Sequence, residues 1–210
     1  ESSARGMYRA LTLQGQYRRE KLQFSAFYTI AENFSDADSE RDAGGFEYVN
    51  SFNLKDEYGF SNQDIRHQFT TNAVYRLPLG FELSGILRAN SGLPFTPRTG
   101  SDTNADGNNN DRPFLTPGVP VGRNSFRNRA FTRTDMRVLK SFNFKESMRL
   151  QFSAEFFNLF NVDNVVFGGN NMIYGAGLQA NGVMAPVNAN FMLLRTADGN
   201  YSTNNSQVGN

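Results

Sequence analysis

The most informative feature of the sequence is a two-residue alternation of apolar and polar side chains. In the first segment, for example, Leu11 and Leu13 flank Thr12, and the alternation resumes after a short polar break at 18–21. Successive side chains of a β-strand point to opposite faces, so this period predicts strands, and the short breaks predict hairpins. The pattern predicts six strands, at about residues 7–18, 22–33, 65–77, 81–90, 132–144 and 148–160.

The connections between the expected strands are strongly unequal in length. Short turns alternate with long, polar, Asn- and Gly-rich segments at about 34–63, 91–131 and 161–210. A soluble β-sandwich also alternates, but its connections are usually of mixed and modest length. Short turns at one end and long loops at the other are typical of outer-membrane barrels. We therefore predict an all-β fold, an antiparallel up-and-down transmembrane β-barrel segment with long extracellular loops. A soluble, calcium-stabilised sandwich is a weaker alternative.

The two faces of the expected strands differ in charge. A charge that faces lipid costs ~2–4 kcal/mol at the bilayer midplane, so the ionised face should line a hydrated interior. The apolar face should contact lipid, with aromatic side chains near the short turns as an interfacial girdle. Lys140 falls at a position of the apolar face, and we expect its long side chain to carry the ammonium group to the membrane–water interface. The charged positions are Arg76, Glu82, Arg88, Arg137, Arg149 and Glu155, and the aromatic positions are Tyr17, Tyr75, Phe81, Phe142 and Phe144.

Composition narrows the possible functions. The chain has 21 Lys and Arg against 20 Asp and Glu, a net charge of +1, which argues against a nucleic-acid partner. Cysteine is absent and His67 is the single histidine, which excludes thiol catalysis and the usual His-based zinc clusters. We expect His67 to lie at the membrane interface. No motif pairs a nucleophile with a base, so we predict that the protein is not an enzyme.

The number of expected strands indicates whether the chain forms a complete barrel. With six strands, both ends of the chain lie on the long-loop side, whereas single-chain barrels normally have their termini at the short-turn end. Six strands are also fewer than the roughly eight of the smallest closed barrels. We therefore expect residues 1–210 to be a partial C-terminal section of one larger barrel domain.

Four motifs resemble one family of outer-membrane proteins. Residues 64–80 resemble a D-x-R-H-x-F … Y-x-L-P-x-G hairpin, and residues 91–96 resemble an S-G-x-P-F strand exit. Residues 106–113 are similar to a D-G … N-D-R-P loop, and residues 155–161 resemble an E-x-F-N-L-F-N stretch. In this order the motifs resemble the C-terminal barrel portion of an Oar-like TonB-dependent receptor, the type with a carboxypeptidase-regulatory-like domain at its N-terminus.

The resemblance implies a barrel of roughly 22 strands in the bacterial outer membrane, occluded by a plug. The plug and the N-terminal domain lie outside this chain. The implied function is uptake of a large or scarce ligand, with this chain supplying barrel wall and extracellular loops. The implied partners are membrane lipid and lipopolysaccharide, the plug of the same protein and the TonB complex. The alternative is a surface adhesion or assembly protein with calcium-ordered loops.

Residues 102–111 carry a pattern with metal chemistry. Oxygen-bearing side chains at alternate positions, followed by Gly107, resemble a loop that wraps a calcium ion. The match is incomplete, because Pro113 stands where a bidentate Glu is usual. The alternative is an exposed loop whose side chains bond their own backbone. The candidate calcium ligands are Asp102, Asn104, Asp106, Asn108 and Asp111.

The loop at 34–63 combines acidic and aromatic side chains. One interpretation is a surface that captures a cationic or sugar-like ligand, with aromatic rings as stacking platforms. The interpretation we favour is a solvated outer loop. The residues concerned are Asp36, Asp38, Glu40, Asp42, Glu47, Asp56 and Glu57, with Phe46, Tyr48, Phe52 and Tyr58.

Overall fold

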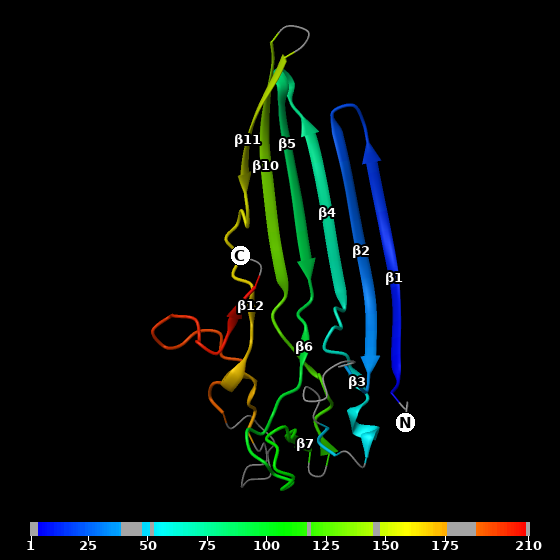
Figure 1. Ribbon diagram of the computed structural model, residues 1–210, viewed down its shortest axis with the longest axis vertical. Coiled ribbons are helices and arrows are strands. Elements are labelled where there is room, and N and C mark those ends of the chain that lie inside the picture. The colour runs from blue at the N-terminus through cyan, green and yellow to red at the C-terminus, as the bar shows by residue number, and fades with distance from the viewer. Residues whose placement is uncertain are drawn as a thin grey trace.

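A computed structural model describes residues 4–38, 48–50, 53–116, 119–144, 148–175 and 188–208. Its main element is a long antiparallel sheet whose strands follow the long axis of the molecule (Figure 1). The strand order is β1-β2-β4-β5-β10-β11, and β3 pairs with β2 beyond its hairpin end. The bounds are β1 Gly6–Arg18, β2 Leu22–Ser35, β3 Gly59–Phe60, β4 His67–Arg76, β5 Phe81–Asn90, β10 Phe131–Phe144 and β11 Met148–Phe156.

The prediction of an all-β antiparallel fold is confirmed. Long strands lie at each of the six positions expected from the alternation. The largest difference is in the last, which was expected to reach residue 160 and ends at Phe156. Asn158 and Asn161 both have φ of 48°, a left-handed conformation that a strand does not contain. Residues with short polar side chains tolerate this conformation, and the chain leaves the sheet there. The described residues contain no helix that is long and apolar enough to cross a membrane.

The pairing register keeps each set of side chains on its own face. Leu13 lies opposite Tyr28, and Leu83 lies opposite both Tyr75 and Val138, all on one face. On the other face the polar positions oppose one another in the same way. A slip of one residue would exchange the two faces of a strand, so the register and the alternation specify each other.

Tight turns join the strands at one end of the sheet. Between β4 and β5 the chain turns at the short 3₁₀ segment η2, Pro78–Gly80, where Leu79 has φ of 61° and Gly80 has φ of 77°. A Cβ atom on Gly80 would lie 2.7 Å from the carbonyl oxygen of Ser141, so this position needs glycine for both its conformation and its space. The expected turn at 145–147 lies outside the described residues.

The loops fold together at the other end of the sheet, and we call their described parts within 36–66, 91–130 and 157–208 the loop cap (Figure 1). Among the described residues, three small two-stranded sheets pair β6 with β9, β7 with β8 and β12 with β13. The elements are η1 Leu54–Glu57, β6 Pro94–Phe95, β7 Phe114–Thr116, β8 Val119–Pro120, β9 Phe126–Arg127, β12 Val165–Val166, η3 Gly169–Met172 and β13 Ser206–Gln207.

The apolar core of the molecule lies in the loop cap. Phe126 and Tyr174 both pack edge-on against Phe191, with ring centroids 5.3 and 5.0 Å apart, and Phe95 and Phe167 complete the cluster. In the sheet, by contrast, every residue of β1 and β11 is exposed. Among the described residues of the six long strands, Ala31 of β2 is the one buried apolar residue, so most of the packed core lies outside the sheet.

Candidate functional site

The polar face of the sheet carries a network of side-chain contacts between neighbouring strands. The hydroxyls of Thr12 and Thr29 lie 2.9 Å apart, and the Ser25 hydroxyl donates to Oδ1 of Asn72 at 2.9 Å. Near the opposite edge of the same face, between β10 and β11, Gln151 donates to the hydroxyl of Ser141 at 3.1 Å. Cross-strand contacts of this kind stabilise a sheet, and the pairing register places these polar side chains on one surface.

Two ion pairs on this face join directly opposed residues. Arg76 and Glu82 face each other across the β4–β5 pair at 3.5 Å, and Arg137 and Glu155 across the β10–β11 pair at 3.5 Å. The side chains of Arg137 and Glu155 are 48% and 46% exposed. Ion pairs with this exposure contribute about 0–1 kcal/mol, because water screens them. The charges on this face are therefore weakly held and accessible.

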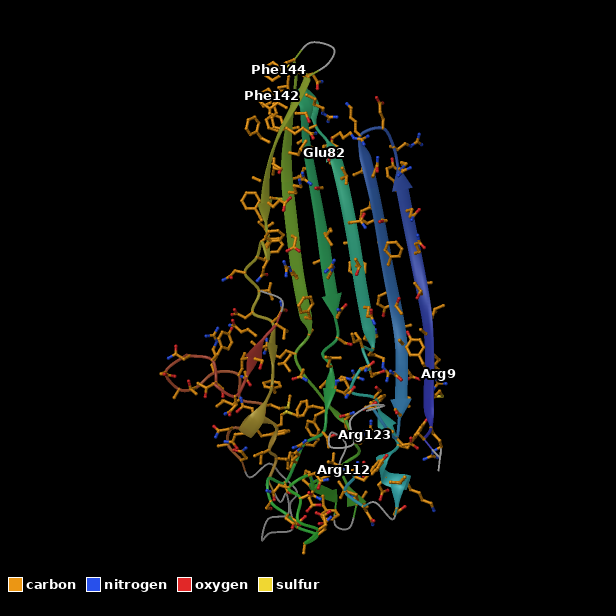
Figure 2. The ribbon with its side chains drawn as sticks, in the orientation of Figure 1. Arg9, Glu82, Arg112, Arg123, Phe142 and Phe144 are labelled. Carbon is orange, nitrogen blue, oxygen red and sulfur yellow. The ribbon has the colours of Figure 1, made fainter. Side chains whose placement is uncertain are left out.

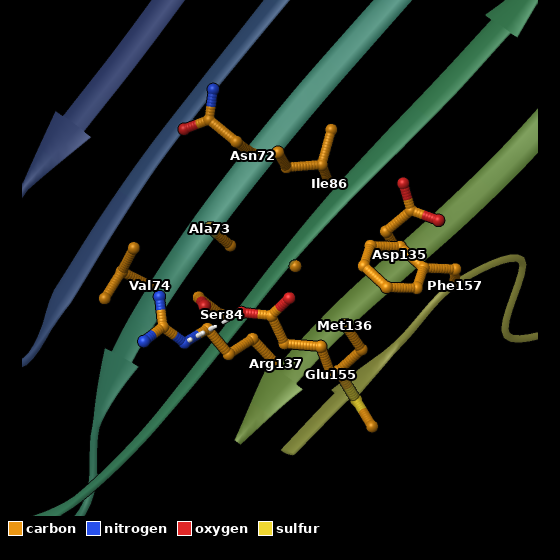
Figure 3. A pocket seen from close by; sticks show the side chains of 11 residues that line it. Asn72, Ala73, Val74, Ser84, Ile86, Asp135, Met136, Arg137, Glu155 and Phe157 are labelled. Atoms are coloured by element: carbon orange, nitrogen blue, oxygen red, sulfur yellow. Dashed lines mark ion pairs between the residues drawn. The ribbon is translucent and has the colours of Figure 1, made fainter. Parts of the chain in front are cut away.

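A hollow of about 430 Å³ lies on the polar face and spans β4, β5, β10 and β11. Figure 3 shows the Arg137–Glu155 pair at its wall beside Ser84, with Asp135 and Phe157 further along. The lining mixes charged groups with the apolar side chains of Ile86 and Phe157. Such a surface can contact a polar partner through ion pairs and an apolar one through the rings.

Positive charge is concentrated next to this hollow. Arg88 of β5 lies directly opposite Arg133 of β10, and like charges in this arrangement repel. Asp135 partly balances them, because Nε of Arg133 donates to both of its oxygens at 2.8 and 3.1 Å.

The apolar face ends in aromatic rings at the short turns, as the alternation predicts. Phe142 packs against Phe144 and edge-on against Phe152, and Figure 2 shows Phe142 and Phe144 at the turn end of the sheet. Nζ of Lys140 lies 4.2 Å from the ring centre of Phe81 and donates to the carbonyl of Leu79. The one lysine of this face thus reaches the turn end, as expected for an interfacial position.

His67 also occupies the position expected for it. Its Nδ1 lies 2.7 Å from the hydroxyl of Tyr28, and the two rings stack. Both residues belong to the apolar face, at the end of β4 next to the loop cap. This contact pairs the Tyr28 hydroxyl with one ring nitrogen of His67.

Buried ion pairs hold the loop cap together. Arg112 pairs with Glu57 at 3.1 Å, and their side chains are 2% and 4% exposed. Arg123 pairs with Asp38, and Arg127 pairs with Asp64. Figure 2 shows Arg112 and Arg123 within the cap. Burial lowers the pKa of Arg112, and the neighbouring carboxylates of Glu57 and Asp56 oppose this effect. Each pair joins loops that are more than 50 residues apart in the sequence.

Three of the acidic loop residues that the structure describes form ion pairs within the chain. Asp36 binds Arg5, Asp38 binds Arg123 and Glu57 binds Arg112. These contacts do not support the capture surface for a cationic ligand, since the carboxylates face arginines of the same chain. Glu40, Asp42, Phe46, Glu47 and Phe52 lie outside the described residues.

The candidate calcium loop is held by its own side chains. Asp102 accepts the amides of Asp106 and Gly107 at 3.2 and 2.9 Å, and Asp111 accepts the amide of Asn104 at 3.1 Å. Asn108 donates its amide to Asp106 at 2.8 Å. The contact between Asn108 and Asp106 has the two-residue spacing of an Asx-turn, and the others are local contacts between carboxylates and the backbone of the same loop. Among the described residues, no three His, Asp or Glu side chains form a group that could hold a metal ion.

A calcium site at this loop stays a prediction. It can be tested by titrating calcium into protein stripped with a chelator. Binding heat that the double variant Asp102→Asn, Asp106→Asn abolishes would support it, and absence of heat would contradict it.

The arginines and asparagines of the loop cap have a structural role that the sequence did not predict. Asn164 and Asn171 are completely buried, and Asn164 binds both the amide and the carbonyl of Thr132 at 2.8 and 3.0 Å. The only sequence signal was that Arg112 belongs to the N-D-R-P motif. Partners so distant along the chain leave no local periodicity.

Comparisons with known proteins identify the family. Residues 1–122 and 116–177 match the family described as outer membrane beta barrel domain, which covers well over half of the chain. No curated protein and no solved structure matches. The match agrees with the separation of the six strands into a charged, hydrated face and an apolar face with an aromatic end. The chain therefore belongs to the outer membrane β-barrel domain family and lies in the bacterial outer membrane.

Proposed function

We propose that this chain supplies barrel wall and extracellular loops of a TonB-dependent receptor that takes up a large or scarce ligand. The observation that carries the proposal is the polar face, on which charged side chains of the long strands are one third to one half exposed and form weak pairs. A small barrel fills its interior with packed side chains, whereas a wide one leaves a watery channel or receives a plug. The exposed charges favour the wide type.

The chemistry of this face also suits a plug that must move. The opposed arginines Arg88 and Arg133 place positive charge beside the hollow, where it can contact an acidic surface of a plug. Contacts made by partly hydrated charges break at little cost, whereas fully buried pairs resist separation. The polar face therefore supports reversible contacts, and we infer that it faces the plug of the full-length protein.

The loop cap supports the same function at the opposite surface of the membrane. Its ion pairs and aromatic cluster hold distant loops in one arrangement over the end of the sheet. A preorganised loop surface binds a ligand with less loss of conformational entropy than separate mobile loops. The TonB complex would act through the N-terminal part of the protein, and catalysis is not part of the proposal.

The proposal can be tested by cysteine labelling in living cells. Cysteine is absent from these residues, so Ser84→Cys on the polar face and Leu83→Cys on the apolar face each introduce one thiol into this chain. In the full-length protein, made cysteine-free elsewhere, a water-soluble maleimide should label Ser84→Cys faster when the TonB complex is energised. Leu83→Cys should stay unlabelled because lipid covers it.

The control is an uncoupler, together with a strain that lacks TonB. Both should slow the labelling of Ser84→Cys to the same basal rate. A labelling rate that ignores both treatments would contradict energised transport and favour the adhesion or assembly alternative, whose surface binding needs no proton-motive force.

A further inference from the structure

The apolar face of the sheet changes character at its loop end. Arg5 and Arg9 have the same parity as Leu11 and Leu13, so they stand on the face that contacts lipid. Figure 2 shows Arg9 near the loop end of β1. The position opposite Arg9 in β2 is Glu32. Charge on this face therefore begins abruptly, after a run of apolar side chains.

A single carboxylate joins two of the arginines at this edge. Nε of Arg9 donates to Oε2 of Glu32 at 2.7 Å, and Nη1 of Arg66 donates to Oε1 of the same side chain. Arg5 donates its amide and its Nε to Asp36 at 2.7 and 3.1 Å. Three guanidinium groups thus face two carboxylates, and the cluster carries one excess positive charge.

Aromatic rings fix the arginines from the side of the loops. Phe34 stacks with Tyr58 at 6.0 Å and lies 4.6 Å from Phe60, measured between ring centres. The Arg5 guanidinium lies 4.9 Å from the centre of the Tyr58 ring, and that of Arg66 lies 5.1 Å from Phe60. Cation–π contacts of this kind orient a guanidinium without using up its N–H donors.

The height of the cluster matches the outer boundary of the bilayer. Tyr17 belongs to the aromatic residues at the short-turn end, and Arg9 lies eight residues away on the same face of β1. At about 3.3 Å per residue these positions are about 26 Å apart along the strand, which corresponds to about 19–22 Å along the membrane normal for a strand tilted by about 35–45°. The apolar band of an outer-membrane barrel is about 25 Å tall, so the backbone of Arg9 lies just inside its outer edge, and the long side chain can extend to the headgroups of the outer leaflet.

We propose that Arg5, Arg9 and Arg66 form a binding site for the phosphate group of an outer-leaflet glycolipid of the lipopolysaccharide type. The side chains of Arg5 and Arg9 are 61% and 67% exposed, so donors remain open toward the membrane. A guanidinium binds phosphate through paired, charge-assisted hydrogen bonds. Glu32 and Asp36 hold the arginines in place, and the excess positive charge favours an anion.

A purely structural role for these arginines explains their exposure less well than phosphate binding does. A pair between a two-thirds exposed Arg9 and Glu32 contributes little in water. A phosphate group at the membrane surface would use the donors that face outward and would form stronger, charge-assisted hydrogen bonds than water does. The proposal rests on the membrane location of the family and is independent of ligand uptake.

The test uses the full-length protein, purified from outer membranes in a mild detergent and stripped of lipid. Binding of lipid A with both phosphates, and of the same lipid with its phosphates removed, would be measured by native mass spectrometry. The intact protein should prefer the phosphorylated lipid by at least about tenfold. The double variant Arg9→Gln, Arg66→Gln should lose this preference.

Two controls make the result decisive. The double variant Arg137→Gln, Arg149→Gln removes the same charge from the polar face and should keep the preference. Arg9→Lys with Arg66→Lys keeps the charge but not the paired geometry, and it should retain part of the preference. Equal binding of both lipids to the intact protein would overturn the proposal, and so would unchanged binding to the Gln variant. If millimolar inorganic phosphate displaces the lipid, the site binds free phosphate, and the proposal that a lipid occupies it is wrong.

Discussion

The sheet and the loop cap use the same charged residue types in opposite ways. On the polar face Arg137 and Glu155 are about half exposed, and they come from strands that are neighbours in the sequence. In the cap Arg112 and Glu57 are almost fully buried and join separate loops. The first pair depends on water, whereas the second must replace water with direct contacts.

This difference separates two sources of stability in one chain. The sheet is held by backbone pairing and by contact of its apolar face with lipid, and its exposed charges remain available for partners. The cap builds an apolar core and buries ionised groups against one another, as a soluble domain does. A barrel protein can therefore carry a rigid outer surface on a wall whose inner face stays hydrated.

The largest effect is expected when the arginine is removed from each of the two ion pairs. This tests whether the buried pair stabilises the protein more than the exposed pair does. Arg112→Met should destabilise the cap by about 3–5 kcal/mol, because Glu57 is left buried without its partner. Arg137→Met should change stability by about 0–1 kcal/mol, since Glu155 stays in contact with water. Hydrogen exchange of the cap and sheet amides in the full-length protein measures both effects.

A second variant distinguishes loss of the pair from general damage. Arg112→Met combined with Glu57→Met removes both charges and should recover much of the lost protection. Equal effects of Arg112→Met and Arg137→Met would show that the two regions do not differ as we describe.

The next comparison concerns the two faces of a single strand. Leu13→Arg places a charge on the apolar face near the middle of β1 and should cost ~2–4 kcal/mol. Gln14→Arg adds the same charge to the polar face and should cost little. The free energy of unfolding in lipid bilayers, measured by denaturant titration, gives both values. A larger effect for Gln14→Arg would mean that the faces are assigned the wrong way round.

A smaller effect is expected at the turn between β4 and β5. Leu79 adopts a left-handed conformation with φ of 61°, which Asn tolerates better than Leu. Leu79→Asn should therefore raise the free energy of unfolding by about 0.5–1 kcal/mol. Leu79→Ala serves as the matched control, because it shortens the side chain without relieving the strain. Equal stability of the Asn and Ala variants would contradict the explanation.

The smallest expected effect is a pH dependence of stability where the chain passes from β2 into the loop cap. Burial of Asp36 raises its pKa, but hydrogen bonds from the amide and side chain of Arg5 outweigh this, and the pKa lies below its ordinary value of 3.8. The contact should therefore stabilise the folded state fully above that value and lose its effect as the pH falls through the lowered pKa.

The protection factor of the Arg5 amide reports on this contact, because that amide donates to Asp36. Protection should fall in the acid range in the intact protein. Asp36→Asn should show weaker protection with no such step. An identical acid step in the Asn variant would assign the titration to another group.

The candidate site could be predicted in part. The polar face followed from alternation, because residues such as Arg88 and Ser84 have a fixed parity within a strand. The loop cap could not be predicted, because Arg123 and Asp38 are 85 residues apart and no periodicity relates them. The calcium motif shows a further limit, since Asx residues at alternate positions serve a metal ion and their own backbone equally well.

The sequence by itself determined the strands, their order of pairing through short turns and the separation of polar from apolar side chains. These properties are local, since a period of two and a turn of a few residues are sufficient to specify them. Only the tertiary structure decided how the loops pack, which carboxylates their arginines neutralise and which charges meet at the outer edge of the apolar face. Those contacts depend on distances between segments far apart in the chain, which emerge only when the sheet has brought the segments together.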